Sequence, residues 1–241
     1  MKISNILGYD VFSDDLEAIN LNTNCIINTI NPHSYVTAKK DALFKEALIH
    51  SNVLLPDGTG MTYASRILNH NRLQRITGFD IHDFILRKIN AELGKVCYLG
   101  STDETLQLIV SRLKRDSPNV QVSVYSPPFK PVFSEKENME IISHINTFKP
   151  DILFIGMTAP KQEKWVFENK EQIKAGVICS IGAVFDFYAG TIKRPPHWMI
   201  KLKLEWLGRF LNEPKRMWKR NFISTPMFVK DILFTKLRIN H

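Results

Sequence analysis

The sequence predicts an α/β fold: a Rossmann-like, mostly parallel sheet flanked by helices, followed by a basic helical appendage at the C-terminus. The chain has 241 residues, 44% of them hydrophobic, which is enough to bury one sizeable core. Short β-branched or aromatic runs alternate with longer segments whose apolar residues recur every three or four positions, a pattern typical of buried strands between helices. The positive charge is concentrated at the end of the chain.

Short apolar runs bounded by polar or turn residues predict the strands, which are 25–29, 52–55, 95–99, 120–125, 151–155 and 177–181. Apolar residues at helical spacing predict the helices, which are 35–50, 59–68, 79–93, 102–115, 134–147 and 160–173. Ser101 with Glu104, and Ser134 with Glu137, have the spacing of a capping box at two helix starts. The proline-rich run 126–131 is expected to be an extended loop.

The charge distribution divides the chain in two. Residues 193–241 contain 12 Lys and Arg against three acidic residues, whereas residues 1–192 contain 20 basic and 21 acidic residues, so the net charge of +8 comes from the tail. We therefore expect an α/β domain over 1–192 and a basic amphipathic helical appendage over 193–241. Large apolar side chains alternate with the cations of the tail, which suits a helix in the interface of an anionic membrane. The alternative is a packed terminal helical layer with a solvated basic face.

No segment of the sequence has the pattern of a secretory signal or a membrane span, so we expect a cytoplasmic protein. Cys25, Cys97 and Cys179 are widely separated in short apolar runs. We therefore expect buried, reduced thiols and neither a disulfide nor a metal site. The histidines form no ligand pair, and His82 is expected to face solvent or to bond locally.

Polar residues and glycines follow the predicted strands, at the edge where open α/β sheets bind ligands. These runs are Thr29-Ile30-Asn31, Asp57-Gly58-Thr59-Gly60, Gly100-Ser101, Gly156-Met157-Thr158 and Gly182-Ala183. The glycines after Asp57 would let backbone amides approach a ligand at a helix start, and Asp57 itself is a candidate general base. Pro-Asp-Gly is also an ordinary turn sequence, so this run alone does not decide between the two readings.

Further motifs occur in a fixed order along the chain. They are Arg75-Ile76-Thr77-Gly78-Phe79-Asp80, Pro160-Lys161-Gln162-Glu163, the run 182–190, Arg194-Pro195-Pro196, Leu204-Glu205-Trp206-Leu207-Gly208-Arg209 and Glu213-Pro214-Lys215-Arg216. Together with the run at Asp57, this set resembles the WecG/TagA/CpsF glycosyltransferases, glycosyltransferase family 26. The resemblance covers the chain from about residue 29 to residue 220.

The resemblance implies a hexosyltransferase that works by inversion, without a bound metal or other cofactor. The donor would be a UDP-sugar carrying N-acetylmannosamine, its uronic acid, or a related hexose or uronic acid. The acceptor would be a polyprenyl-diphosphate-linked sugar used in bacterial surface-polysaccharide biosynthesis. Such an enzyme would associate peripherally with the inner face of the plasma membrane, and self-association into a homo-oligomer is left open.

The resemblance also implies roles for particular residues. Asp57 would be the general base. The other catalytic residues would be Gln162, Arg209 and Arg216. The residues that line the substrate site would be Thr29, Asn31, Arg75, Asp80, Gly100, Gly156 and Arg220. Because the sequence has no Asp-x-Asp motif, arginine forks and helix N-terminal amides are the groups available to stabilise a departing diphosphate.

Other readings of these features exist. The basic tail suggests a nucleic-acid-binding protein, but it has no recognition motif and the rest of the chain is almost neutral. A nucleotide-dependent oxidoreductase would need a third glycine after Gly58-Thr59-Gly60, where the chain has Tyr63. Taken singly, Asp80 is equally explained as a helix cap, and Gln162 and Glu163 as first-turn residues favoured by the helix dipole.

Overall fold

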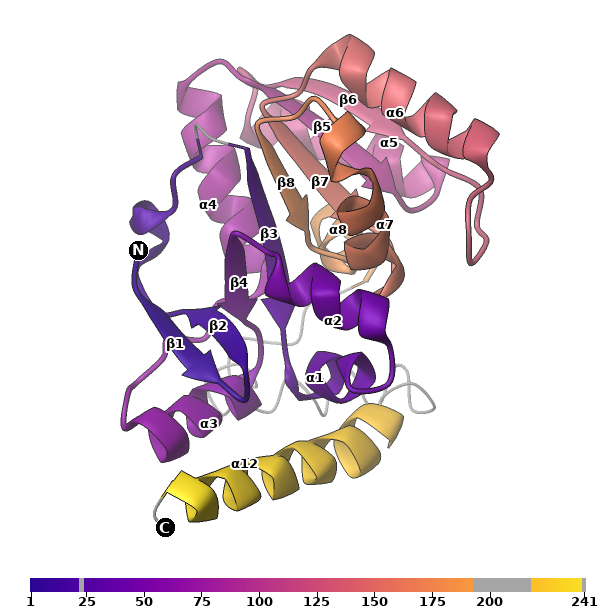
Figure 1. The fold of residues 1–241 in the computed structure, drawn as a ribbon. Coiled ribbons are helices and arrows are strands. Elements are labelled where there is room, and N and C mark those ends of the chain that lie inside the picture. Colours follow the sequence, from indigo (N-terminus) through magenta and orange to yellow (C-terminus); the bar gives the residue numbers. More distant parts are fainter. Residues whose placement is uncertain (22–23, 193–217, 240–241) are drawn as a thin grey trace.

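The computed structural model describes residues 1–21, 24–192 and 218–239 (Figure 1). Its centre is a six-stranded sheet in the order β4-β3-β8-β7-β5-β6, in which every pair is parallel. The strands are β3 (Cys25–Ile30), β4 (Val53–Pro56), β5 (Lys95–Gly100), β6 (Gln121–Tyr125), β7 (Ile152–Gly156) and β8 (Val177–Ser180). The predicted parallel sheet is confirmed, with each predicted strand within a few residues of its expected bounds.

Helices cover both faces of the sheet, which confirms the α/β class. Side chains alternate between the faces along each strand, so Tyr98 packs on one side and Leu99 on the other. The helices on the Tyr98 face are α4 (Gly78–Ala91), α5 (Asp103–Asp116) and α8 (Val184–Ala189). The helices on the Leu99 face are α6 (Glu135–Phe148) and α7 (Lys161–Asn169). As predicted, Cys25, Cys97 and Cys179 are buried and unpaired.

A third apolar cluster lies beside the β4 edge of the sheet and includes Ile30 and Leu54 from the strands. An N-terminal hairpin and helices from both ends of the chain build it (Figure 1). These helices are α1 (Pro32–Ala38), α2 (Ala42–Ile49), α3 (Thr59–Asn69) and α12 (Thr225–Ile239). The cluster therefore joins the C-terminal appendage to the sheet.

The sequence does not predict the antiparallel hairpin of β1 (Ile3–Ile6) and β2 (Tyr9–Phe12). Burial alternates along β1, so this four-residue strand is not a continuous apolar run. The turn between the strands places Leu7 at φ 52° and Gly8 at φ 87°. Glycine suits such a conformation, whereas leucine gives no turn signal.

The predicted helix over 35–50 is in fact two helices, α1 and α2. Asp41 starts the second helix, because its side chain accepts a hydrogen bond from the backbone N–H of Phe44 at 3.0 Å. The same carboxylate pairs with Lys164 of α7 at 2.9 Å. Asp41 therefore fixes both the break between the helices and the position of α7.

The sequence predicts two capping boxes, and one of them forms. Ser134 and Glu137 make the reciprocal hydrogen bonds at the start of α6. The predicted box of Ser101 and Glu104 is wrong, because Thr102 is the N-cap of α5 and its hydroxyl accepts the hydrogen bond from the helix. Ser101 instead turns the chain after β5, with φ 61°.

The appendage ends in α12, which lies across α1 and α3 (Figure 1). Phe228 and Ile232 are 1% and 3% exposed in the third cluster, so this face is core, as the packed-layer alternative predicts. Asp231 accepts a hydrogen bond from the Tyr35 hydroxyl at 3.0 Å and pairs with Lys39 at 2.6 Å, both in or beside α1. Within the described ranges, no helix combines the length and the apolar character that crossing a bilayer requires.

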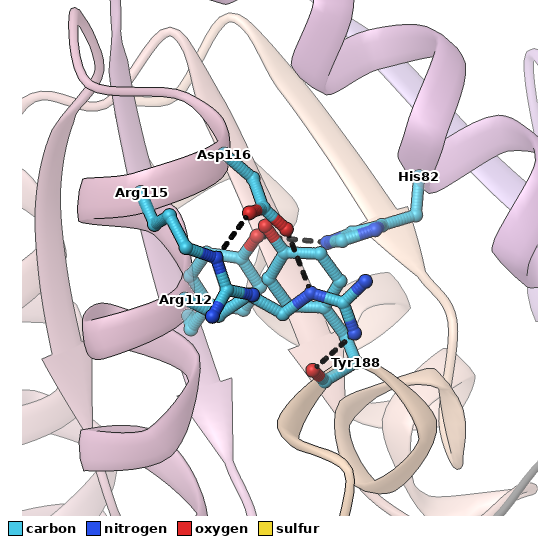
Figure 2. A network of polar contacts seen from close by, with 6 residues as sticks. His82, Arg112, Arg115, Asp116 and Tyr188 are labelled. Atoms are coloured by element: carbon cyan, nitrogen blue, oxygen red, sulfur yellow. Dashed lines mark hydrogen bonds and ion pairs between the residues drawn. The ribbon is translucent and has the colours of Figure 1, made fainter.

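Polar contacts join α4 to β5 and α5 to α8 at one place in the fold (Figure 2). His82 of α4 is 1% exposed, and its Nε2 shares a hydrogen bond of 2.8 Å with the Tyr98 hydroxyl. Arg112 of α5 lies over the Tyr188 ring, donates to the Tyr188 carbonyl at 2.9 Å, and pairs with Asp116. Burial lowers the pKa of His82 to about 3, so the ring is neutral. His82 thus bonds locally but does not face solvent, and the contacts of Arg112 with Tyr188 tie α8 to α5.

Candidate active site

A pocket opens at the carboxyl ends of the central strands, where the sequence predicts that ligands bind. Most of its wall is polar, and the wall residues come from distant parts of the chain. We call it the polar pocket, and its defining residues are Thr29, Asn31, Asp57, Gly156, Gln162, Glu163, Asp186 and Arg220.

Asp57 lies at the tip of β4, directly after Pro56. Its backbone N–H donates to the carbonyl of Ile30 at 2.9 Å, which continues the pairing of β4 with β3 by one residue. The carbonyl of Pro56 accepts from the N–H of Ile76 at 3.1 Å. Both bonds use the backbone, so they fix the position of Asp57 without engaging its carboxylate.

The two glycines after Asp57 have structural explanations. Gly58 is the N-cap of α3 at φ 86°, a conformation that side chains rarely adopt. A Cβ on Gly60 would lie 2.4 Å from Cγ of Pro32, so this glycine allows α3 to begin against α1. Both glycines also line a cavity next to Asp57, so the expectation that they bring backbone toward a ligand stays a prediction.

Asn31 links the end of β3 to α1. Its Oδ1 accepts from the backbone N–H groups of His33 and Ser34, both at 3.0 Å, and so caps the helix. Because the cap holds the carbonyl oxygen, the group that Asn31 presents to the pocket is its Nδ2 amide, a hydrogen-bond donor. A donor at this place suits a sugar hydroxyl or a phosphate oxygen.

Gln162 and Glu163, in the first turn of α7, are 3% and 2% exposed and line the polar pocket. Nε2 of Gln162 donates to Oε1 of Glu163 at 2.9 Å. Burial raises the pKa of Glu163 to about 7. The sequence predicts Gln162 as a site residue but treats Glu163 only as a first-turn residue.

Three other predicted site residues have packing or capping roles. Oδ2 of Asp80 accepts from both the N–H and the hydroxyl of Thr77, at 2.8 and 2.7 Å, and forms the capping box of α4. A Cβ on Gly100 would lie 2.7 Å from the carbonyl oxygen of Gly156, and one on Gly156 would lie 2.4 Å from the Phe185 ring. Gly156 borders the polar pocket, whereas Asp80 and Gly100 do not.

A second cavity adjoins the polar pocket and has mostly apolar walls. We call it the apolar groove, and its apolar wall consists of Tyr63, Ile67, Phe222, Phe228, Val229, Ile232 and Leu233. Asn31, Asp57 and Arg220 line both cavities, and Arg75 lines the groove. The two cavities therefore meet at Asp57.

Arg220 reaches this junction from the π-helical turn Lys219–Ser224, which precedes α12. The hydroxyl of Ser224 shares a hydrogen bond of 2.8 Å with Nδ1 of His33 in α1, so the turn is attached beside Asn31. The predicted residues Arg209 and Arg216 lie outside the described residues. Over residues 1–21, 24–192 and 218–239, no three His, Cys, Asp or Glu side chains group as metal ligands would.

Comparisons with a family model and with individual proteins point to the same family. Residues 2–241 match the model of the glycosyl transferase WecG/TagA/CpsF family. An N-acetylglucosaminyldiphosphoundecaprenol N-acetyl-beta-D-mannosaminyltransferase of Bacillus subtilis strain 168 is 30% identical over 224 residues, which are 92% of this chain and 85% of the relative. A protein with the same name from Staphylococcus aureus strain MW2 is 30% identical over 216 residues, 90% of this chain and 82% of the relative.

Proposed function

The chain belongs to the WecG/TagA/CpsF glycosyl transferase family, and on this premise we propose that it transfers N-acetylmannosamine from a UDP-sugar to a polyprenyl-diphosphate-linked N-acetylglucosamine. The predicted resemblance is thereby confirmed, and with it the class of hexosyltransferase. The choice of sugar and acceptor rests on the names of relatives about 30% identical to this chain. The product would serve bacterial surface-polysaccharide assembly.

The observation that carries the proposal is the junction of the two cavities at Asp57. A polar pocket suits a nucleotide sugar, and an adjoining groove with apolar walls suits the first isoprene units of a lipid carrier. Donor and acceptor would then meet where Asn31, Asp57 and Arg220 line both cavities. A transferase needs this arrangement, because its two substrates must react in one place.

The chemistry assigned to the junction is an inverting displacement. The carboxylate of Asp57 removes the proton of the acceptor hydroxyl as that oxygen attacks the anomeric carbon, and the bond to UDP breaks on the opposite face. Negative charge then develops on the diphosphate. The Arg220 guanidinium and the Nδ2 amide of Asn31 are the donors that line the junction and can stabilise it. Arg209 and Arg216 stay predicted contributors.

The test of this function is a transfer assay with UDP-N-acetylmannosamine and a short-chain lipid diphosphate N-acetylglucosamine in excess EDTA. We expect full transfer, because arginine and amide donors take the place of a metal at the leaving group. Transfer that stops in EDTA and returns with Mg²⁺ or Mn²⁺ would contradict the metal-free mechanism. Failure to transfer this sugar under any condition, with transfer of another hexose, would correct the donor.

Peripheral membrane association is part of the proposal. On the side of α12 away from the core, Phe234 and Leu237 are 55% and 60% exposed, and the exposed cations Lys230 and Arg238 lie on the same helix. Apolar side chains flanked by cations suit the interface of an anionic membrane, and the neighbouring groove opens along the same helix. A lipid acceptor could then enter the groove from the bilayer.

We expect the double variant Phe234→Glu, Leu237→Glu to bind vesicles of anionic phospholipid at least about tenfold more weakly than the wild type, because two apolar side chains are lost from the interface. Co-sedimentation with the vesicles measures this. The matched control is Leu108→Glu, which changes an exposed leucine of α5. Equal vesicle binding by the double variant and the control would rule out α12 as the membrane contact.

A further inference from the structure

The polar pair Gln162 and Glu163 is buried more deeply than its place at a helix start requires. Each lies three residues before a buried apolar residue of α7, Trp165 and Val166 respectively, so the pair occupies the inward face of the helix. The amide group of Gln162 also reaches the end of β8, since a Cβ on Gly182 would lie 3.8 Å from both of its terminal atoms. The pair thus forms part of the wall of the polar pocket.

Each member of the pair has one buried oxygen without a partner. Nε2 of Gln162 donates to Oε1 of Glu163, but Oε1 of Gln162 and Oε2 of Glu163 have no hydrogen-bond partner among the described residues. A buried polar atom left in this state costs about 1–3 kcal/mol. Two such atoms on neighbouring residues that line a pocket indicate that the missing partner is a ligand.

The lysines next to Glu163 in sequence do not pair with it, so they do not stabilise its charged form. On its own helix, Lys161 donates to the carbonyl of Lys130, and Lys164 pairs with Asp41 of α2, so neither cation pairs with Glu163. The charged residues that line the pocket from the other elements are Asp57 after β4, Asp186 of α8 and Arg220 before α12. With a pKa of about 7 caused by burial, a large share of Glu163 is a carboxylic acid at neutral pH.

When Glu163 is neutral, the pair offers a ligand one hydrogen-bond donor and one acceptor. The Oε2–H of Glu163 is a donor, and Oε1 of Gln162, whose amide is hydrogen-bonded to Glu163, is an acceptor. A matching ligand offers a carbonyl and an N–H next to each other on one edge. The imide edge of uracil has this pattern, whereas the N–H and carbonyl of a trans acetamide point in opposite directions.

The position of Gln162 and Glu163 also favours uracil over the acetamido group as their ligand. Gln162 reaches the end of β8, two strands from β4, and α7 follows β7, three strands from β4. At about 4.8 Å per strand, the strand ends beside the pair lie roughly 10–14 Å from the end of β4 that precedes Asp57. The acetamido group of a sugar is attached next to the anomeric carbon and stays close to the reaction. The base is a ribose and two phosphates away, and the same pocket has the aromatic lining residues Phe79, Phe185 and Phe187.

We infer that Gln162 and a protonated Glu163 bind the uracil imide edge of the donor, and so select the uridine nucleotide. The inference rests on the proposed function, since it assumes that the polar pocket holds the UDP-sugar. Glu163 then acts in substrate recognition and does not take part in proton transfer. Affinity for the donor is present while Glu163 is protonated and falls as pH rises through about 7, because the carboxylate repels a carbonyl oxygen.

Calorimetric titration with UDP-N-acetylmannosamine and UDP-glucose tests the inference, because neither ligand ionises between pH 6 and 8. For Glu163→Ala we expect affinity about 10-fold to 100-fold lower for both ligands at pH 6. Glu163→Gln, which keeps a neutral donor, should bind within a few-fold of wild type at pH 6 and lose the pH dependence that wild type shows. The matched control is Glu168→Gln, on the exposed side of the same helix, which should behave as wild type.

Each other result has a definite meaning. Wild-type affinity of Glu163→Ala for both ligands would overturn the inference. So would a loss limited to UDP-N-acetylmannosamine, which would assign the pair to the acetamido group. A Glu163→Gln variant that binds normally but does not turn over would make Glu163 a proton-transfer residue and also overturn it. Wild type that binds neither nucleotide would overturn the proposed function itself, and the inference with it.

Discussion

Asp57→Asn should slow sugar transfer by about 10²–10⁴-fold, the range expected for loss of a general base. Asparagine has nearly the same shape but cannot accept the proton of the acceptor hydroxyl. The fold should survive, because Asp57 is positioned by backbone hydrogen bonds that asparagine also makes. Single-turnover rates at saturating donor and acceptor measure the chemical step without the contribution of binding.

Two comparisons make the Asp57 result specific. Affinity for the UDP-sugar should change little in Asp57→Asn, because the carboxylate is assigned to the acceptor side of the junction. Asp103→Asn, an exposed first-turn carboxylate of α5, should leave the rate unchanged. Near-normal turnover of a folded Asp57→Asn enzyme would remove Asp57 as the base.

Arg220→Ala should lower kcat by about 10²–10³-fold, the typical cost of removing one donor from a developing negative charge. Arg220 lines both cavities. Among the described arginines, it is therefore the one that we assign to the diphosphate. Steady-state kinetics with both substrates measure the change. Arg220→Lys should recover part of the rate, because lysine keeps the charge but loses the two-pronged donor geometry.

The control for Arg220 is Arg238→Ala, which removes an exposed cation from α12 and lines neither cavity. Both variants lower the positive charge of the appendage by one, so a general effect on membrane attraction would appear in each. A fall in kcat confined to Arg220→Ala supports the clamp. An unchanged kcat in Arg220→Ala, or an equal fall in both variants, would contradict it.

The parallel sheet was predictable because its strands are short, mostly apolar segments, and β4 and β7 are continuous apolar runs, which is a strong signal. The β1–β2 hairpin was not, because it consists of two four-residue strands joined through Leu7 in a left-handed conformation. The break between α1 and α2 depends on Asp41, whose capping role is fixed partly by its ion pair with Lys164 in a distant helix. Such tertiary contacts are not contained in local periodicity.

The polar pocket was predictable in outline, because polar residues follow adjacent parallel strands. Glu163 was missed, although the signal was present: helical spacing puts it on the same face as the apolar Val166. A polar residue on the apolar face of a helix is evidence for a functional role, whereas a position in the first turn is common for acidic residues and gives no such evidence. The meeting of Asp57 with Arg220 depends on how α12 packs on α1 and α3, which no sequence spacing determines.

The most direct test of the central claim is a crystal structure of the enzyme with UDP and a short-chain lipid diphosphate N-acetylglucosamine. We expect UDP in the polar pocket, the lipid in the apolar groove, and the acceptor hydroxyl within hydrogen-bond reach of the Asp57 carboxylate at the junction. A complex in which the nucleotide or the acceptor binds elsewhere, with Asp57 contacting neither, would contradict the claim that the two cavities bring the substrates together at this residue.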